Sequence, residues 1–403
     1  MTATSPGFVG ARLAQARKAR GLTAVSLAEI LGITSASISQ YEHDKQAPRP
    51  ELTERLAVQL NVPPTFFLRE VTPDTHERAT KWRSNTTATK FARERAEIRY
   101  EWLREIVEYL GSFLNFPALN IPVFDGVPDD FRELSHADID RAAKVCREHW
   151  GLGTGPIPDL VVLLESNGVI VSRGRLNAEG LDAFSEWLPN DLPYVFLGSD
   201  INVGVRSRFD TAHELGHLVM HRHVSKKQFG KPEDFKILER QAHRFAAAFL
   251  LPKEQFFREL WAPTLDAFAS LKPRWKTSIK GMIVHSHRHG LLSDTQYQRA
   301  MINYNRRWKD GEPSDDQIVP EQPRFLARCM EMILEESVQT RDQVLAELPF
   351  AQFDIEELIG LPRGFLSGAN AEVIPLERPT FKVQTGERGG KVVSVDFSPR
   401  RGS

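Results

Sequence analysis

The chain has 403 residues, 41% of them hydrophobic, and a formal net charge of -1 from 52 basic and 53 acidic side chains. That length allows two or three domains with cores of their own, and the balanced charge implies no overall attraction to nucleic acid or membranes. The two cysteines exclude a disulfide scaffold or a zinc ribbon and suit a reducing compartment. Residues 1–21 lack the apolar core of a signal peptide, and no apolar run approaches the roughly 20 residues that span a bilayer, so we expect a cytoplasmic protein without membrane contact.

Periodic segments and turn residues along the chain predict a mainly α-helical fold with a small β-sheet, an α+β arrangement. We expect five parts in chain order. They are a five-helix domain at 8–70, a linker and helix at 71–115, a core with a histidine motif at 116–262, a helical region at 263–368 and a flexible tail at 369–403.

The first domain has one interruption in its helical spacing. Apolar residues recur with the period of a helix on both sides of Gly32, from Leu27 to Ile38. Gly32 stands where a left-handed turn requires glycine, and Thr34 offers a hydroxyl that can cap the next helix. A helix, a glycine turn and a capped helix form the helix-turn-helix pattern, whose second helix enters the DNA major groove.

This segment resembles the XRE family of phage-repressor-like helix-turn-helix domains, and the match continues through residues 41–50, 52, 56–57, 60–62 and 66–68. The resemblance implies a recognition helix at about residues 35–41 and an internal ion pair between Arg17 and Glu42. It also implies two groups of DNA contacts, to base edges from Ser35, Ala36, Ser39 and Gln40, and to phosphates from Ser37, Lys45 and Arg49.

Gln40 is the strongest candidate for reading a base, because its amide can pair with both hydrogen-bonding groups of adenine in the major groove. Double-stranded DNA is therefore the expected partner of residues 8–70, with a homodimer as a further expectation. The alternative is a helix-turn-helix that docks another protein, since the small excess of basic residues in this domain offers few phosphate contacts.

Residues 212–218, Ala-His-Glu-Leu-Gly-His-Leu, form the most specific motif of the chain. His213 and His217 are four residues apart, so on a helix both imidazoles share one face and can reach one metal ion. Zn²⁺ accepts neutral imidazole nitrogens, and Glu214 is placed to take a proton from a metal-bound water. The alternative is an ordinary helix with two structural histidines.

A catalytic zinc site needs a third protein ligand and one open position. The candidates are His221, His223, Glu239 and His243. Glu239 is predicted to begin an amphipathic helix 22 residues after His217, and a second helix that presents a carboxylate is the gluzincin arrangement. Short strands are expected before the motif, within 168–171, 181–187 and 193–197, and their edge can align an extended peptide.

Arg208-Phe209 before the motif, Glu239-x-x-Ala242-x-x-Phe245-Ala246 after it and Leu250-Leu251-Pro252 resemble the ImmA/IrrE family of metallopeptidases. The resemblance implies that Zn²⁺ is held by His213, His217 and Glu239, with Glu214 as the general base. His243 stands where the family often has Asn, so it is an alternative ligand or a hydrogen-bond partner of one, and His221 is a weaker candidate for the same roles. The oxyanion donor is open among His221, His223 and Tyr194.

The resemblance implies narrow proteolysis of a regulatory protein, a helix-turn-helix repressor or antitoxin, that controls stress, mobile-element or toxin–antitoxin genes. An attached DNA-binding domain raises the effective concentration of substrates bound near the same DNA. Two alternatives are a transcription regulator whose zinc domain senses a ligand without cleaving anything, and the toxin component of a toxin–antitoxin pair. An intact Glu214 favours an enzyme, because a structural zinc site needs no base.

Overall fold

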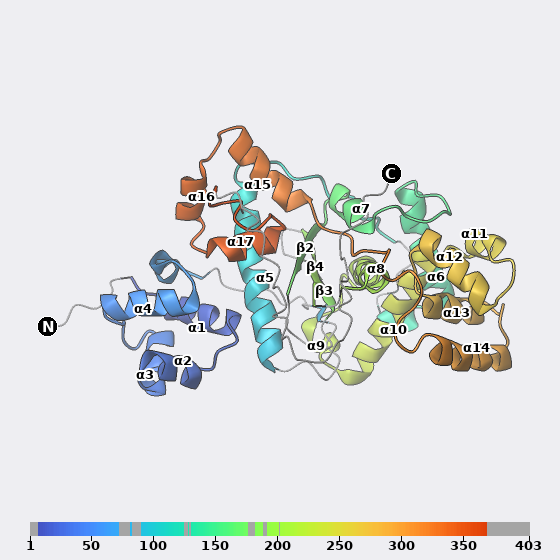
Figure 1. Ribbon diagram of the computed structural model, residues 1–403, viewed down its shortest axis with the longest axis horizontal. Helices are drawn as coiled ribbons and strands as arrows, with labels where there is room; N and C mark the ends of the chain where they lie inside the picture. Colours follow the sequence, from blue (N-terminus) through green and yellow to red (C-terminus); the bar gives the residue numbers. More distant parts are fainter. Residues whose placement is uncertain are drawn as a thin grey trace, which may run out of the picture.

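We analysed the chain in a computed structural model. The structure describes residues 7–71, 81–82, 90–124, 128, 130–175, 182–187, 192–200 and 202–368. The tail predicted at 369–403 and most of the predicted linker lie outside these residues. None of the helices in the described part of the chain combines the length and hydropathy that crossing a bilayer needs. The predicted mainly helical fold with a small sheet is confirmed (Figure 1).

The amino-terminal domain consists of α1 (Gly10–Ala19), α2 (Ala24–Leu31), α3 (Ser35–Glu42), α4 (Pro50–Leu60) and a final 3-10 helix, η1 (Pro64–Leu68). Gly32 ends α2 in the left-handed conformation, with φ 67°, as the sequence predicts. The hydroxyl of Thr34 caps α3 by accepting a 3.1 Å hydrogen bond from the backbone N–H of Ser37.

The predicted ion pair between Arg17 and Glu42 is also confirmed. Nε and Nη2 of Arg17 lie 2.5 and 3.0 Å from the two carboxylate oxygens of Glu42. Both side chains are about nine-tenths buried, so the pair joins α1 to α3 in a place where water competes little. This contact holds α3 at a set angle to the rest of the domain.

The sheet contains β1 (Lys81–Trp82), β2 (Ile170–Gly174), β3 (Ala183–Trp187) and β4 (Pro193–Gly198) in the order β1-β3-β4-β2. β2 runs parallel to β4, whereas β3 is antiparallel to both β4 and β1. The strands within the three predicted segments are thus present.

The sheet is covered on both faces, so alternate residues of its strands enter two different cores. Phe184 of β3 and Phe196 of β4 stack at 5.3 Å between centroids, and Tyr100 of α5 (Lys90–Gly111) meets Phe184 edge-on. Val195 and Leu197 of β4 point the other way, into the core that α8 (Gly204–Met220) shares. Figure 1 shows the sheet between α5 and α8.

The remaining helices surround these layers. In chain order they are η2 (Phe131–Glu133), α6 (His136–His149), α7 (Leu160–Ser166), α9 (Lys226–Phe229), α10 (Pro232–Leu250), α11 (Lys253–Glu259), α12 (Leu265–Trp275), α13 (Ile279–Arg288), α14 (Asp294–Arg307), α15 (Phe325–Glu335), α16 (Arg341–Glu347) and α17 (Gln352–Ile359).

The helices after residue 263 serve two cores. α12 and α13 pack with α10 and α11, whereas α15 and α17 return to α5 and the far face of the sheet. Arg20, at the end of α1, donates to both carboxylate oxygens of the buried Asp354 in α17 at 2.9 and 2.6 Å. The amino-terminal domain is therefore anchored to the carboxy-terminal helices.

Candidate metal centre

The motif histidines lie along one side of α8 at four-residue intervals. His213, His217 and His221 are at most 1% exposed. Their ring centroids are 4.7 Å apart between His213 and His217 and 5.0 Å apart between His217 and His221. One side of the helix thus presents a row of three imidazoles, as i and i+4 positions require.

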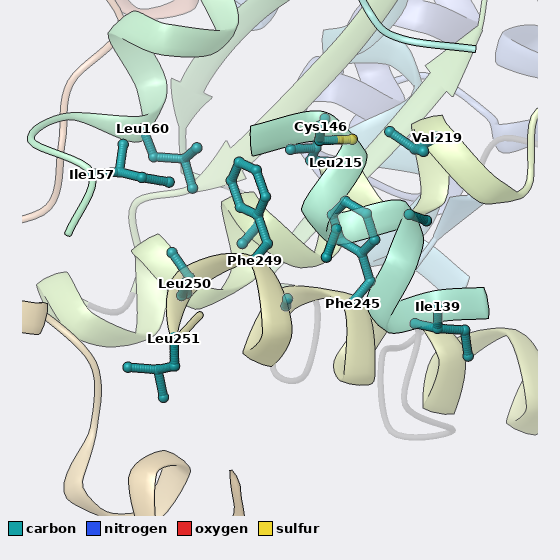
Figure 2. Close-up of a cluster of buried hydrophobic side chains, with 14 of the residues drawn as sticks. Ile139, Cys146, Ile157, Leu160, Leu215, Val219, Phe245, Phe249, Leu250 and Leu251 are labelled. Carbon is teal, nitrogen blue, oxygen red and sulfur yellow. The ribbon is translucent and has the colours of Figure 1, made fainter. Parts of the chain in front are cut away.

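The row faces α10, which approaches α8 closely at Gly216. A Cβ on Gly216 would lie 2.9 Å from Cδ1 and 3.1 Å from Cβ of Phe245, so only glycine leaves room for this ring. Figure 2 shows Phe245 and Phe249 of α10 packed with Leu215 and Cys146. The absence of a side chain at Gly216 sets how near the two helices lie.

α10 begins at Pro232, so the predicted start at Glu239 was wrong by nearly two turns. Pro232 occupies the first turn, where a missing N–H costs nothing, and Glu233 and Asp234 follow at the positive end of the helix dipole. The early start places Glu239 in the middle of a stable helix. Its carboxylate is therefore held by regular backbone rather than by a frayed end.

Ligand atoms of three side chains meet between the helices. Nε2 of His217 lies 3.1 Å from Nε2 of His213 and 3.2 Å from Oε1 of Glu239. Nε2 of His213 lies 3.5 Å from Oε2 of Glu239. Ligand atoms about 2.0–2.2 Å from a tetrahedral zinc ion stand about 3.3 Å from one another. These three side chains therefore fit a zinc ion.

His243 adds a fourth side chain to this cluster. One ligand atom each of His213, Glu239 and His243 lie within 4.8 Å of one another, and the rings of His213 and His243 are 4.6 Å apart. Nδ1 of His243 is 2.8 Å from the backbone carbonyl oxygen of Glu239, one turn earlier on α10. The hydrogen bond to that carbonyl makes Nδ1 the protonated nitrogen and leaves Nε2 as the atom able to bind metal.

His221 lies behind His217 rather than beside its Nε2. Nδ1 of His221 is 2.9 Å from Nδ1 of His217, and its Nε2 is 2.9 Å from Oε1 of Gln241. The amide N–H of Gln241 donates to the carbonyl of Phe131 at 2.7 Å, which turns its oxygen towards His221. His221 Nε2 therefore donates, its Nδ1 accepts from His217, and Nε2 of His217 keeps a lone pair for a metal.

Gln241 was missed by sequence reasoning. It stands two residues after Glu239 and has no spacing that singles it out from other polar residues of α10. Its importance comes from the hydrogen bonds that α10 brings to α8 and η2.

Glu214 is fully buried on the same helix. Its backbone carbonyl oxygen is 3.5 Å from the hydroxyl of Ser185, so β3 lies directly beside this turn of α8. Of the oxyanion candidates, Tyr194 packs against Tyr100 on the opposite face of the sheet, so that prediction was wrong. His223 is exposed beyond the end of α8.

Electrostatics keep Glu239 ionised. Burial raises the pKa of its carboxyl, but the contacts with His213 and His217 outweigh burial and hold that pKa well below its usual range. A carboxylate at this position is the form that a divalent cation requires.

The predicted DNA contacts lie on or just after α3. Ser35, Ala36, Ser39, Gln40, Lys45 and Arg49 are exposed, and Ser37 is partly buried beside Thr34. α1 packs against both α3 and α5, so α3 lies on the side of the domain remote from the rest of the molecule (Figure 1). The surface around α3 is therefore accessible to a duplex.

Two family models match this chain. Residues 13–67 match a helix-turn-helix model, and residues 164–281 match the model described as the IrrE N-terminal-like domain. The chain joins an XRE-type helix-turn-helix domain to an IrrE-like domain. The IrrE-like domain is metallopeptidase-like and includes α8 and α10 with the whole cluster described above. Both resemblances found in the sequence are thereby confirmed.

Comparisons with single proteins add little. No curated protein matches the chain. A solved structure described as a Mycobacterium tuberculosis transcriptional regulator is 19% identical, with a TM-score of 0.29, over 40% of this chain and 49% of its own. The chain thus spans about half of that structure, and so low a TM-score supports no conclusion about fold or function.

Gly216→Ala is expected to push α10 away from α8, because the added methyl group overlaps the ring of Phe245. Overpacking of this kind costs about 1–3 kcal/mol of folding free energy. We expect a lower unfolding midpoint in urea and weaker Zn²⁺ binding, measured by competition with a chromogenic chelator.

The matched control is Gly155→Ala, since a Cβ at Gly155 meets nothing within 4 Å. Wild-type zinc affinity in Gly216→Ala would show that the helix approach does not position Glu239.

Proposed function

We propose that the IrrE-like domain is a zinc-dependent endopeptidase in which His213, His217 and Glu239 hold Zn²⁺ and Glu214 is the general base. The observation that carries this proposal is the spacing of the ligand atoms. The two imidazole Nε2 atoms lie 3.1 Å apart, and the carboxylate of Glu239 brings Oε1 to 3.2 Å from His217 and Oε2 to 3.5 Å from His213, close to the spacing around a tetrahedral zinc ion. Three protein ligands leave a fourth position for water, as catalysis requires.

When bound, zinc makes water acidic near neutral pH and polarises a peptide carbonyl. Glu214 takes a proton from the attacking water and returns it to the leaving amine as the C–N bond breaks. His221 and Gln241 orient His217 through its Nδ1, so that its Nε2 faces Nε2 of His213 and Oε1 of Glu239, where it would hold the ion. Glu239 contributes a carboxylate that stays ionised.

We propose a regulatory protein as the substrate, either a helix-turn-helix repressor or an antitoxin. Its cleavage would release stress, mobile-element or toxin–antitoxin genes. Support comes from the attached helix-turn-helix domain, which keeps the peptidase near proteins that bind the same DNA. The outer edge of β3, next to α8, pairs with the extended residues Lys81–Trp82. That edge therefore has the geometry for an extended peptide, which competes there with the chain's own segment.

Glu214→Gln tests the peptidase. Wild type and variant are incubated with Zn²⁺ and with each helix-turn-helix repressor encoded beside this gene, and products are identified by mass spectrometry. We expect cleavage by wild type and a loss of at least about a hundredfold in Glu214→Gln, because the amide cannot accept the proton.

The zinc content of each variant distinguishes loss of the general base from loss of the metal site. Glu214→Gln should retain the zinc content of wild type, whereas His213→Ala should lose both zinc and activity. Undiminished cleavage by Glu214→Gln would refute its role as the base. The toxin alternative would show instead as growth arrest that Glu214→Gln abolishes.

A second candidate function is supported by His243. If its Nε2 completes the coordination of zinc, the site has four protein ligands and no position for water, as in structural and sensory sites. The protein is then a transcription regulator whose zinc domain cleaves nothing.

His243→Ala distinguishes the two candidate functions. In an open site, the absorption spectrum of the Co²⁺-substituted protein and the cleavage rate change little, because His243 only bonds the carbonyl of Glu239. In a closed site, the variant gains a water ligand, its Co²⁺ spectrum shifts, and any cleavage is confined to the variant. The control is His287→Ala, because His287 lies on α13.

We further propose that the exposed surface of α3 reads DNA and that Gln40 contacts a base. After selection of a preferred duplex from random sequence, Gln40→Ala should lower discrimination at one base pair by about 1–3 kcal/mol. Lys45→Ala should weaken binding to every duplex. It should also reduce the slope of the logarithm of the binding constant against the logarithm of the salt concentration by about 1. Val58→Ala, on α4, is the control. Equal effects of Gln40→Ala on all sequences would exclude base reading.

A further inference from the structure

Solvent reaches the metal cluster at Glu239. His213 and His217 are at most 1% exposed, whereas the side chain of Glu239 is 16% exposed. His243, one turn later on α10, is also only partly buried. A molecule that approaches the cluster from solvent therefore meets the face of α10 that carries Glu239 and His243.

That face of α10 also carries two cations. Lys236 lies three residues before Glu239, and Arg240 lies four residues after Lys236 and three before His243. Residues three or four apart are neighbours on the surface of a helix, with Cβ atoms about 5–6 Å from one another. The side chains of Lys236 and Arg240 are both exposed. Two positive charges thus border the entrance to the cluster.

Neither cation is neutralised by an acidic side chain. Nε of Arg240 donates to the backbone carbonyl of Lys236 at 3.2 Å, and in the described part of the chain neither side chain forms an ion pair. Asp234, on the same helix, is paired with Arg132 at 2.7 Å. Glu233 is exposed at the start of α10 and makes no ion pair with Lys236. Both cations are therefore available to a molecule from solvent.

The segment beside His217 adds further positive charge. Phe229 of α9 lies 5.7 Å from His217 and 6.4 Å from Phe235 of α10, measured between ring centroids, so α9 borders the cluster. Lys227 of α9 and Lys231, just before α10, are exposed and form no ion pair with the acids that the structure describes. The net charge of the chain is only -1, so attraction of an anion to this place is a local property.

We propose that the cationic rim formed by Lys227, Lys231, Lys236 and Arg240 selects peptide segments with acidic side chains next to the bond that is cleaved. Ammonium and guanidinium groups on exposed side chains donate charge-assisted hydrogen bonds to the carboxylates of such a segment. The inference rests on the proposed peptidase function and names the chemical class of its substrate.

Peptide hydroxamates are the probes, because a hydroxamate binds zinc through its oxygens and holds the attached peptide at the metal. One pair is acetyl-Glu-Glu-NHOH and acetyl-Gln-Gln-NHOH, and a second pair carries the same dipeptides on the other side of the hydroxamate. Binding to the full-length, zinc-loaded protein is measured by calorimetry. In at least one pair, we expect the Glu probe to bind about threefold or more tighter than the Gln probe. The advantage should shrink in about 0.5 M salt, which screens charges beyond a few ångströms.

Two failures are distinguishable in this experiment. Equal affinities within both pairs would overturn the proposed selectivity and leave the open zinc site standing. Absence of binding by every hydroxamate would show that bound zinc has no open position, which would refute the proposed peptidase and this inference with it.

The double variant Lys236→Gln, Arg240→Gln tests the two cations next to Glu239. The advantage of the Glu probe should fall towards equality, and an advantage as large as that of wild type would overturn the proposal. The conservative exchange Lys236→Arg, Arg240→Lys keeps both charges and should keep the advantage. The charge-matched control is Lys280→Gln, Arg299→Gln, which removes two exposed cations from α13 and α14. It should bind both probes like wild type.

Discussion

The approach of α10 to α8 at Gly216 is the contact on which the candidate site depends. Neither helix carries a complete metal site, because His213 and His217 lie on α8 and Glu239 lies on α10. Phe245 packs over Gly216 at a distance that any side chain would increase. The same packing buries the imidazoles, whereas the side chain of Glu239 stays 16% exposed. One glycine and one aromatic ring thus set the spacing of the candidate ligands.

A series of hydrogen bonds connects the histidine cluster to the backbone of η2. Phe131 O, Gln241, His221 and His217 form a directed series, and only one arrangement of protons satisfies every member. That arrangement leaves a lone pair on Nε2 of His217, which a cation requires. Such series are sensitive to the loss of any member because a buried donor or acceptor then lacks a partner.

The two faces of the sheet support different parts of the protein. One face supports α8 and the metal cluster, and the other supports α5, which carries the amino-terminal domain together with α15 and α17. The pair between Arg20 and Asp354 connects these parts. The helix-turn-helix domain is therefore mounted on the same sheet as the peptidase-like core, with α3 facing away from it (Figure 1).

Local signals were sufficient for much of this protein. The glycine turn at Gly32, the cap at Thr34 and the strands before the motif depend on neighbouring residues, so the sequence predicts them. The four-residue spacing of His213 and His217 likewise places both rings on one face of any helix. The start of α10 was misjudged although Pro232 and the acidic residues after it are a local signal for a helix start.

What the sequence by itself determined was the identity of the two domains and the set of candidate metal ligands. Tertiary structure decided which of them meet, because that depends on how closely two helices approach. It placed His221 behind His217, brought His243 into the cluster and moved Tyr194 to the other face of the sheet. It also revealed the role of Gln241, since contacts between distant segments produce no periodic pattern in the sequence.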